Sequence, residues 1–103
     1  MFVYADNAAT TRIAPQVLDA MLPYLKEEYG NPSTLCKLGR EAKIAIEKAR
    51  EQVAQVIGAK AEEIFFTGSG TEADNMALKG VLYGPAGKGK KHLITTKIEH
   101  HAI

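Results

Sequence analysis

The run GSGTEADN at residues 68–75 has the composition of an anion-binding turn. It follows the β-prone run EIFFT at 63–67 and leads into a stretch whose apolar spacing predicts a helix. Glycines at a strand-to-helix turn let backbone N–H groups close around an anion, and the first helical turn adds unpaired donors and partial positive charge. The Thr71 hydroxyl can cap the helix, donate to a phosphate oxygen, or do both. The turn therefore indicates phosphate, although an ordinary capped turn has the same local pattern.

The other side chains suited to chemistry are three histidines and one cysteine. The spacing of His92, His100 and His101 matches no standard zinc pattern, and adjacent histidines rarely bind one ion together, so no metal is expected. A single cysteine, Cys36, excludes an intramolecular disulfide and is typical of a reducing, cytoplasmic setting. We interpret Cys36 as a small apolar residue or a surface thiol.

The composition narrows the classes of partner. The 103 residues suffice for one small domain, with 46% hydrophobic and 24% charged residues and a net charge of +1. This balance offers no electrostatic attraction to nucleic acid or to an anionic membrane. No apolar run reaches the roughly 20 residues of a membrane span, and the N-terminus lacks the pattern of a signal peptide. The basic loop 84–91 (GPAGKGKK) lacks interleaved aromatic residues, so we expect no nucleic-acid binding there.

Two helices are expected before the glycine turn. Pro15 suits a first helical turn, and the apolar residues after it recur with helical spacing, although Pro23 predicts a kink or an early end. The run YGNPS at 29–33 predicts a turn. Residues 39–57 have one apolar and one charged face, which predicts a second helix, and Gly58 is a natural C-terminal stop.

Strands are expected on both sides of the third helix. The runs 64–67 (IFFT) and 92–96 (HLITT) are β-prone and flank the helical stretch 76–82. A strand–helix–strand order at this spacing predicts a parallel α/β unit with a right-handed crossover. Two strands cannot make a covered parallel sheet, because such sheets are buried on both faces. The pattern therefore indicates an incomplete architecture.

Five segments carry a pattern together. In chain order they are 4–11 (YADNAATT), 29–33 (YGNPS), 39–40 (GR), 65–75 (FFTGSGTEADN) and 99–100 (EH). They resemble one family, the cysteine desulfurases of the NifS/IscS type, in their N-terminal part, and the resemblance covers essentially all 103 residues.

These are class-V aminotransferase-like enzymes that use pyridoxal 5'-phosphate (PLP). The resemblance implies the N-terminal part of a PLP fold-type-I large domain, a three-layer αβα architecture with a mostly parallel sheet. Residues 1–14 would form an arm and 15–103 an incomplete PLP-binding domain.

The resemblance implies roles for individual residues. Gly70 and Thr71 would bind the PLP phosphate, and His100 would stack on the pyridine ring and assist proton transfers as a catalytic residue. The arm at 7–10 would run near the active-site opening. The chain has Gly70 where the family usually has alanine, which keeps the N–H donor but loosens the turn. It has Cys36 where many members have histidine, and Cys36 is not read as the sulfur-accepting nucleophile, which lies far downstream in the family.

The resemblance also implies that the Schiff-base lysine, the acidic partner of the pyridinium nitrogen, the catalytic cysteine and the substrate-binding arginine lie beyond residue 103. We expect the chain to be an N-terminal fragment that is inactive alone. The complete protein would convert L-cysteine to L-alanine and pass persulfide sulfur to an iron–sulfur scaffold or another acceptor, as a homodimer. The alternative is a stand-alone phosphate- or nucleotide-binding α/β module, although the chain lacks Walker and G-x-G-x-x-G patterns. A third reading is a non-catalytic fragment that associates through its apolar surface.

Overall fold

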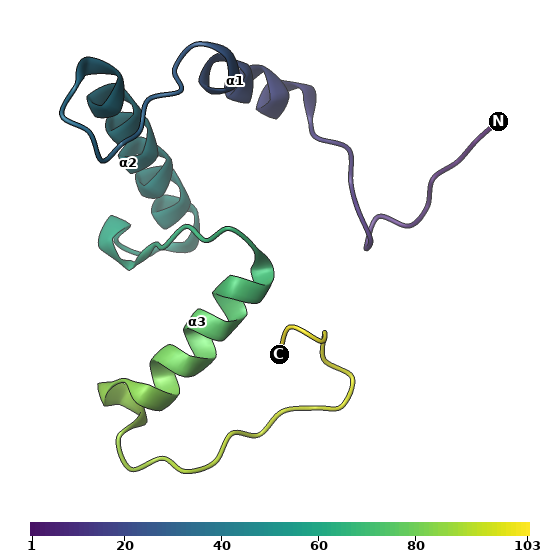
Figure 1. The fold of residues 1–103 in the computed structure, drawn as a ribbon. Coiled ribbons are helices and arrows are strands. Elements are labelled where there is room, and N and C mark those ends of the chain that lie inside the picture. The colour runs from purple at the N-terminus through teal and green to yellow at the C-terminus, as the bar shows by residue number, and fades with distance from the viewer. The chain divides into compact units, whose positions relative to one another are not determined.

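The computed structural model describes all 103 residues, and its regular elements are helices only. The α-helices are α1, α2 and α3, and a short 3-10 helix follows each of the last two (Figure 1). The chain divides into two compact units, unit 1 (Met1–Glu63) and unit 2 (Ile64–Ile103), which are described separately. The element bounds are α1 Pro15–Lys26, α2 Lys37–Ile57, η1 Ala61–Glu63, α3 Gly70–Tyr83 and η2 Pro85–Gly87.

Helix α1 begins at Pro15, as predicted. Proline at the first helical position loses nothing, because its missing N–H would have no partner there. The helix does not end at Pro23 but continues to Lys26, and the backbone N–H groups of Glu27 and Glu28 both donate to the Pro23 carbonyl at 2.9 Å. Residues 1–14 before it contain no helix, and their one turn is closed by the Ala9 N–H on the Asp6 carbonyl at 3.1 Å.

Helix α2 confirms the predicted second helix and its stop signal. It ends at Gly58, whose φ of 69° is left-handed and whose N–H donates to the carbonyls of Ala54 and Gln55. Its apolar face is where the chain's two buried hydrophobic residues, Ala42 and Ala54, are found. Its charged face carries exposed ion pairs, such as Lys37–Glu41 at 3.7 Å, and such pairs contribute only a few tenths of a kcal/mol each.

The predicted turn at 29–33 leads into a compact connection before α2. The Asn31 side chain accepts a hydrogen bond from the Ser33 N–H at 2.9 Å, and both the N–H and the hydroxyl of Thr34 donate to the Asn31 carbonyl. Gly39, in the first turn of α2, is buried beneath this connection. A Cβ atom at Gly39 would lie 2.6 Å from the carbonyl oxygens of Asn31 and Thr34, so the close approach needs glycine.

The two predicted strands do not form, and the predicted sheet is not present. Residues 64–67 and 92–96 form neither helix nor strand. A strand is defined by hydrogen bonds to a neighbouring strand, and a high β-propensity does not supply that neighbour. Most apolar side chains of the two runs are exposed, as Phe65 at 71% and Ile94 at 94% illustrate, whereas Ile64 is half-buried. The second run does contribute to an apolar hollow that it shares with α3, lined by Leu78, Val81, His92 and Leu93 among others.

The chain buries little of its apolar surface. Its accessible area is 9400 Å², whereas a folded monomer of 11.2 kDa exposes about 5,700 Å². The apolar stripe of α1 is exposed from Val17 to Leu25 except at Leu22, which is half-buried. These faces have the spacing of core faces, yet the residues described here do not cover them. Separately, none of the helices has the length and apolarity needed to span a membrane.

Candidate functional site at the N-terminus of helix α3

Ser69 caps α3 and closes one side of the glycine turn. Its Oγ accepts a hydrogen bond from the Glu72 N–H at 3.2 Å, and its carbonyl accepts from the Ala73 N–H at 3.1 Å. The Glu72 carboxylate reaches back and accepts from the Gly68 N–H at 2.7 Å. This reciprocal arrangement resembles a capping box, in which side chains satisfy the donors that the helix leaves unpaired. The helix cap is therefore Ser69, which leaves the Thr71 hydroxyl available.

The turn keeps a set of donors free. The backbone N–H groups of Gly70 and Thr71, and the Thr71 hydroxyl, have no hydrogen-bond partner in the chain. The space beside Gly70 is open, since a Cβ atom placed there would meet nothing within 4 Å. Two N–H groups and a hydroxyl at a helix N-terminus are the donors that bind phosphate in proteins. The residues present therefore fit the phosphate group of PLP.

The Glu72 carboxylate is the one feature of the turn that opposes an anion. Its negative charge lies in the first turn of α3, where it stabilises the helix dipole. Its Oε2 is occupied by the Gly68 N–H, so Gly68 is not among the free donors. A bound phosphate would therefore be held by Gly70 and Thr71 while Glu72 retains Gly68.

His100 lies in the C-terminal segment of unit 2, in a turn closed by the Ile103 N–H on the His100 carbonyl at 2.9 Å. Its Nδ1 atom accepts a hydrogen bond from the Ala102 N–H at 3.1 Å. Since Nδ1 is an acceptor, the neutral ring carries its proton on Nε2. The His101 ring lies on one face of His100, with centroids 3.9 Å apart and an interplanar angle of 35°. His100 as a whole is exposed.

Asn75 connects these two parts of unit 2, and sequence reasoning assigned it no role. Its Nδ2 donates to the Thr71 carbonyl at 2.9 Å and to the Ala102 carbonyl at 3.3 Å. The available signal was an asparagine inside a helix, where its side chain competes for backbone groups and is a poor helix former. The structure thus brings Thr71 and the His100 turn together through one amide.

The remaining candidates lie in unit 1. Cys36 is exposed at the N-cap of α2, with its Sγ 3.2 Å from the Thr34 hydroxyl. The hydrogen bond with Thr34, helped by the backbone N–H of Gly39, lowers the pKa of the Cys36 thiol below its ordinary value. The arm residues 7–10 are exposed. No cluster of three or more His, Cys, Asp or Glu side chains is placed to hold a metal ion.

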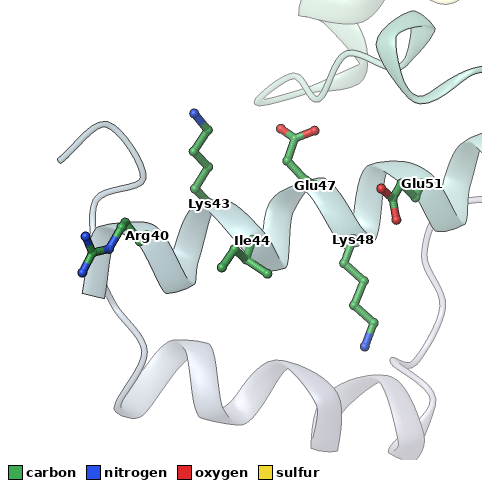
Figure 2. A pocket seen from close by; sticks show the side chains of 6 residues that line it. All are labelled: Arg40, Lys43, Ile44, Glu47, Lys48 and Glu51. Atoms are coloured by element: carbon green, nitrogen blue, oxygen red, sulfur yellow. The ribbon is translucent and has the colours of Figure 1, made fainter. Parts of the chain in front are cut away.

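A hollow on the surface of α2 does not have the features of a binding site. It is lined by residues of that one helix, and Figure 2 shows Lys43 and Glu47 extending on one side of the helix and Lys48 on the other. Its charged side chains are of both signs, so it offers no field of a single sign to a charged ligand. It is a solvated helix face. The lining residues are Arg40, Lys43, Ile44, Glu47, Lys48 and Glu51.

Comparison with known proteins identifies the class. The sequence model of the family described as Aminotransferase class-V matches residues 3–103, and the chain belongs to this family. Its similar relatives are named more narrowly. It is 55% identical over 101 residues to a cysteine desulfurase IscS of Dictyoglomus turgidum and 50% identical to one of Methanosarcina thermophila. Each match covers 98% of this chain and 25% of the relative, so the chain spans about a quarter of their length.

A solved structure is also similar. A NifS-like protein matches with a TM-score of 0.88 at 48% sequence identity, over 99% of this chain and 28% of that one. The predicted resemblance to NifS/IscS-type cysteine desulfurases is thereby confirmed. The likeness also supports the PLP fold-type-I class, while the sheet of that fold is absent from the structure described here.

Proposed function

We propose that the chain is the N-terminal part of a PLP-dependent cysteine desulfurase and supplies the phosphate-binding turn and the ring-stacking histidine of its active site. The observation that carries this is the set of free donors at Gly70 and Thr71, linked through Asn75 to the turn that holds His100. The names of the similar relatives support the same activity.

Each residue then has one task. The N–H groups of Gly70 and Thr71 and the Thr71 hydroxyl bind the phosphate, where the N-terminal end of α3 favours negative charge. His100 stacks on the pyridine ring through the face that His101 does not cover. Its Nε2 is positioned to hold or release a proton near the reacting atoms. When bound, PLP supplies an electron sink that weakens bonds to the substrate's carbon atoms.

The architecture follows from the same proposal. Residues 64–67 and 92–96 become strands of a mostly parallel sheet within a three-layer αβα domain, where neighbouring strands cover Phe65 and Ile94. Residues 1–14 form the arm, and 15–103 form the first part of the PLP-binding domain. The Schiff-base lysine and the catalytic cysteine come from residues outside this chain.

The complete protein converts L-cysteine to L-alanine in the cytoplasm and transfers persulfide sulfur to an acceptor such as an iron–sulfur scaffold protein. It acts as a homodimer. The relatives' names support the substrate, and the resemblance to the family supports the acceptor and the dimer.

The test uses the complete protein that contains residues 1–103. We expect an absorbance band at about 410–430 nm from bound PLP and one alanine formed for each sulfide released from cysteine under reducing conditions. Thr71→Val should weaken the band at limiting PLP, whereas Thr71→Ser should retain it. A complete protein with neither the band nor alanine formation would refute the proposal.

A second candidate function is a phosphate- or nucleotide-binding module without catalysis. It is favoured by one observation, that the free donors of the turn and the His100 link all lie within unit 2. Titration of residues 1–103 with inorganic phosphate and with ATP tests it. Binding to this chain, together with no PLP band in the complete protein, would favour the module over the enzyme.

A further inference from the structure

The side chain of Asn75 makes the one side-chain hydrogen bond that joins the glycine turn to the His100 segment. Its amide spans 27 positions to reach the Ala102 carbonyl at 3.3 Å, in a half-buried setting. All the other hydrogen bonds found in the glycine turn and in residues 96–103 connect positions at most four apart. Local turn geometry therefore holds each part internally, and Asn75 sets their separation.

Both N–H groups of the Asn75 side-chain amide donate hydrogen bonds. A side-chain amide has two N–H groups, and those of Asn75 reach two carbonyls, Thr71 at 2.9 Å and Ala102 at 3.3 Å. The first contact fixes the residue that offers a free N–H and a free hydroxyl. The second holds the carbonyl of Ala102, two residues after His100.

The backbone of Ala102 contacts both Asn75 and the imidazole ring of His100. While its carbonyl accepts from Asn75, its N–H donates to His100 Nδ1 at 3.1 Å. An Nδ1 atom that accepts a hydrogen bond cannot carry the proton, so the neutral ring is held in the Nε2–H form. One asparagine thus acts on both groups through backbone atoms, without touching a ligand itself.

We propose that Asn75 is a positioning residue that sets the distance between the phosphate-binding turn and the His100 ring and fixes the tautomer of that ring. The tautomer part stands on the structure alone. The part that concerns PLP rests on the proposed function. The chain of contacts runs from Thr71 through the Asn75 amide to Ala102 and from Ala102 to His100.

The first experiment reads the tautomer in the complete protein without cofactor. Histidine is labelled with ¹⁵N, the His100 signals are assigned with His100→Asn, and ring ¹⁵N shifts distinguish Nδ1–H from Nε2–H. The variants are Asn75→Asp, which keeps the size but removes both donors, and Asn75→Ala. Asp74→Ala is the matched control, because the neighbouring Asp74 makes no side-chain hydrogen bond.

The wild type and Asp74→Ala should show His100 as a single Nε2–H form, and both Asn75 variants should show a mixture of the two tautomers. A wild-type ring that is already mixed, or Asn75 variants that keep the pure Nε2–H form, would overturn the proposal. Asn75→Asp guards against a folding defect in Asn75→Ala, since it is isosteric and exposes no cavity.

The second experiment separates distance from tautomer and from the proposed function. Inorganic phosphate engages only the turn, whereas PLP engages the turn and His100. Asn75→Ala, which removes the amide without adding a charge beside the phosphate, should therefore weaken PLP binding about tenfold and phosphate binding less than about twofold, by equilibrium titration. Equal losses for both ligands would overturn the positioning role. A wild-type protein that binds no PLP would refute the proposed function instead, while the ¹⁵N shifts would still decide the role of Asn75.

Discussion

The N-termini of α2 and α3 both follow a turn that contains glycine and serine, but only at α3 are backbone donors free to bind a ligand. We call the N-terminus of α2 the closed end and the N-terminus of α3 the open end. Before α2, hydrogen-bond donors of the connection from Asn31 to Cys36 bind acceptors within that same connection. A Cβ atom at Gly39 would clash with the carbonyl oxygens of this connection. Before α3, Ser69 caps a single donor, and Gly70 faces open space with its N–H free. A glycine near a helix start therefore has two physical meanings, which are close packing and ligand access.

Because their donors differ in availability, the N-termini of α2 and α3 stabilise different anions. At α2 the backbone N–H of Gly39 and the Thr34 hydroxyl act on Cys36, so the positive end of the helix stabilises a thiolate of the chain itself. At α3 the corresponding donors remain for an external anion. The same helix-end electrostatics serve an internal group in unit 1 and a ligand in unit 2.

The largest expected effect is a loss of unfolding free energy when a methyl group is added at Gly39, in the N-terminal turn of α2. Gly39→Ala places a methyl group 2.6 Å from the Asn31 carbonyl oxygen, and the resulting overpacking should cost about 2–3 kcal/mol of unfolding free energy. Urea denaturation of the complete protein measures it. Gly80→Ala is the matched control, because the space beside Gly80 is empty, and it should stabilise the protein by about 0.5–1 kcal/mol. Equal effects of the two substitutions would contradict the closed end.

The second prediction removes a donor from the open end. Thr71→Val keeps the shape but loses the hydroxyl that has no partner in the chain, and PLP binding should weaken about tenfold, equivalent to about 1.4 kcal/mol. Thr71→Ser keeps the hydroxyl and should stay within about threefold of the wild type. Fluorescence titration of the complete protein with PLP measures both. Wild-type affinity in Thr71→Val would show that the hydroxyl does not contact the phosphate.

The sequence predicted the helices better than the strands, and the reason is the range of the signals. Pro15 and Gly58 are local signals that depend on a few neighbouring residues, and both mark helix ends as expected. The runs 64–67 and 92–96 have high β-propensity, but strand formation also depends on a neighbouring strand, and neither run is a strand in the structure. Propensity is a property of the run itself, whereas the neighbouring strand is not encoded in it.

In the candidate site, too, the sequence predicted the local feature but not the contacts that depend on side-chain geometry. Composition and position predicted an anion-binding turn within residues 68–75, and the resemblance to the family assigned the phosphate to Gly70 and Thr71, which stays a prediction. They could not show that Ser69 would be the cap or that Glu72 would occupy the Gly68 N–H, because both depend on side-chain geometry. The contact between Asn75 and Ala102 spans 27 positions, and no local pattern in a single sequence encodes it.

The third prediction adds a methyl group to the open end. Gly70→Ala keeps the N–H donor and meets nothing within 4 Å, so it should leave PLP affinity within about twofold. It should also raise the free energy of unfolding by about 0.5–1 kcal/mol, since alanine restricts the unfolded chain more than glycine does. Urea denaturation and PLP titration measure the two effects. A destabilised variant would show that the turn requires glycine, as Gly39 does, and would remove the contrast between the two helix ends.

The smallest effect tests the closed end without changing its packing. Thr34→Val removes the hydroxyl that is the main cause of the lowered Cys36 pKa, so the thiol pKa should rise toward its ordinary value. Less thiolate is then present near neutral pH, and alkylation of Cys36 by iodoacetamide at pH 7 should slow a few-fold. The rate ratio should shrink as the pH rises above the pKa values of both proteins, because both thiols are then ionised. Labelling is read at Cys36 by peptide mass spectrometry, with Thr67→Val as the control in unit 2. A rate that is unchanged by Thr34→Val at pH 7 would mean that the α2 end does not stabilise the thiolate, and that its closure is a matter of packing alone.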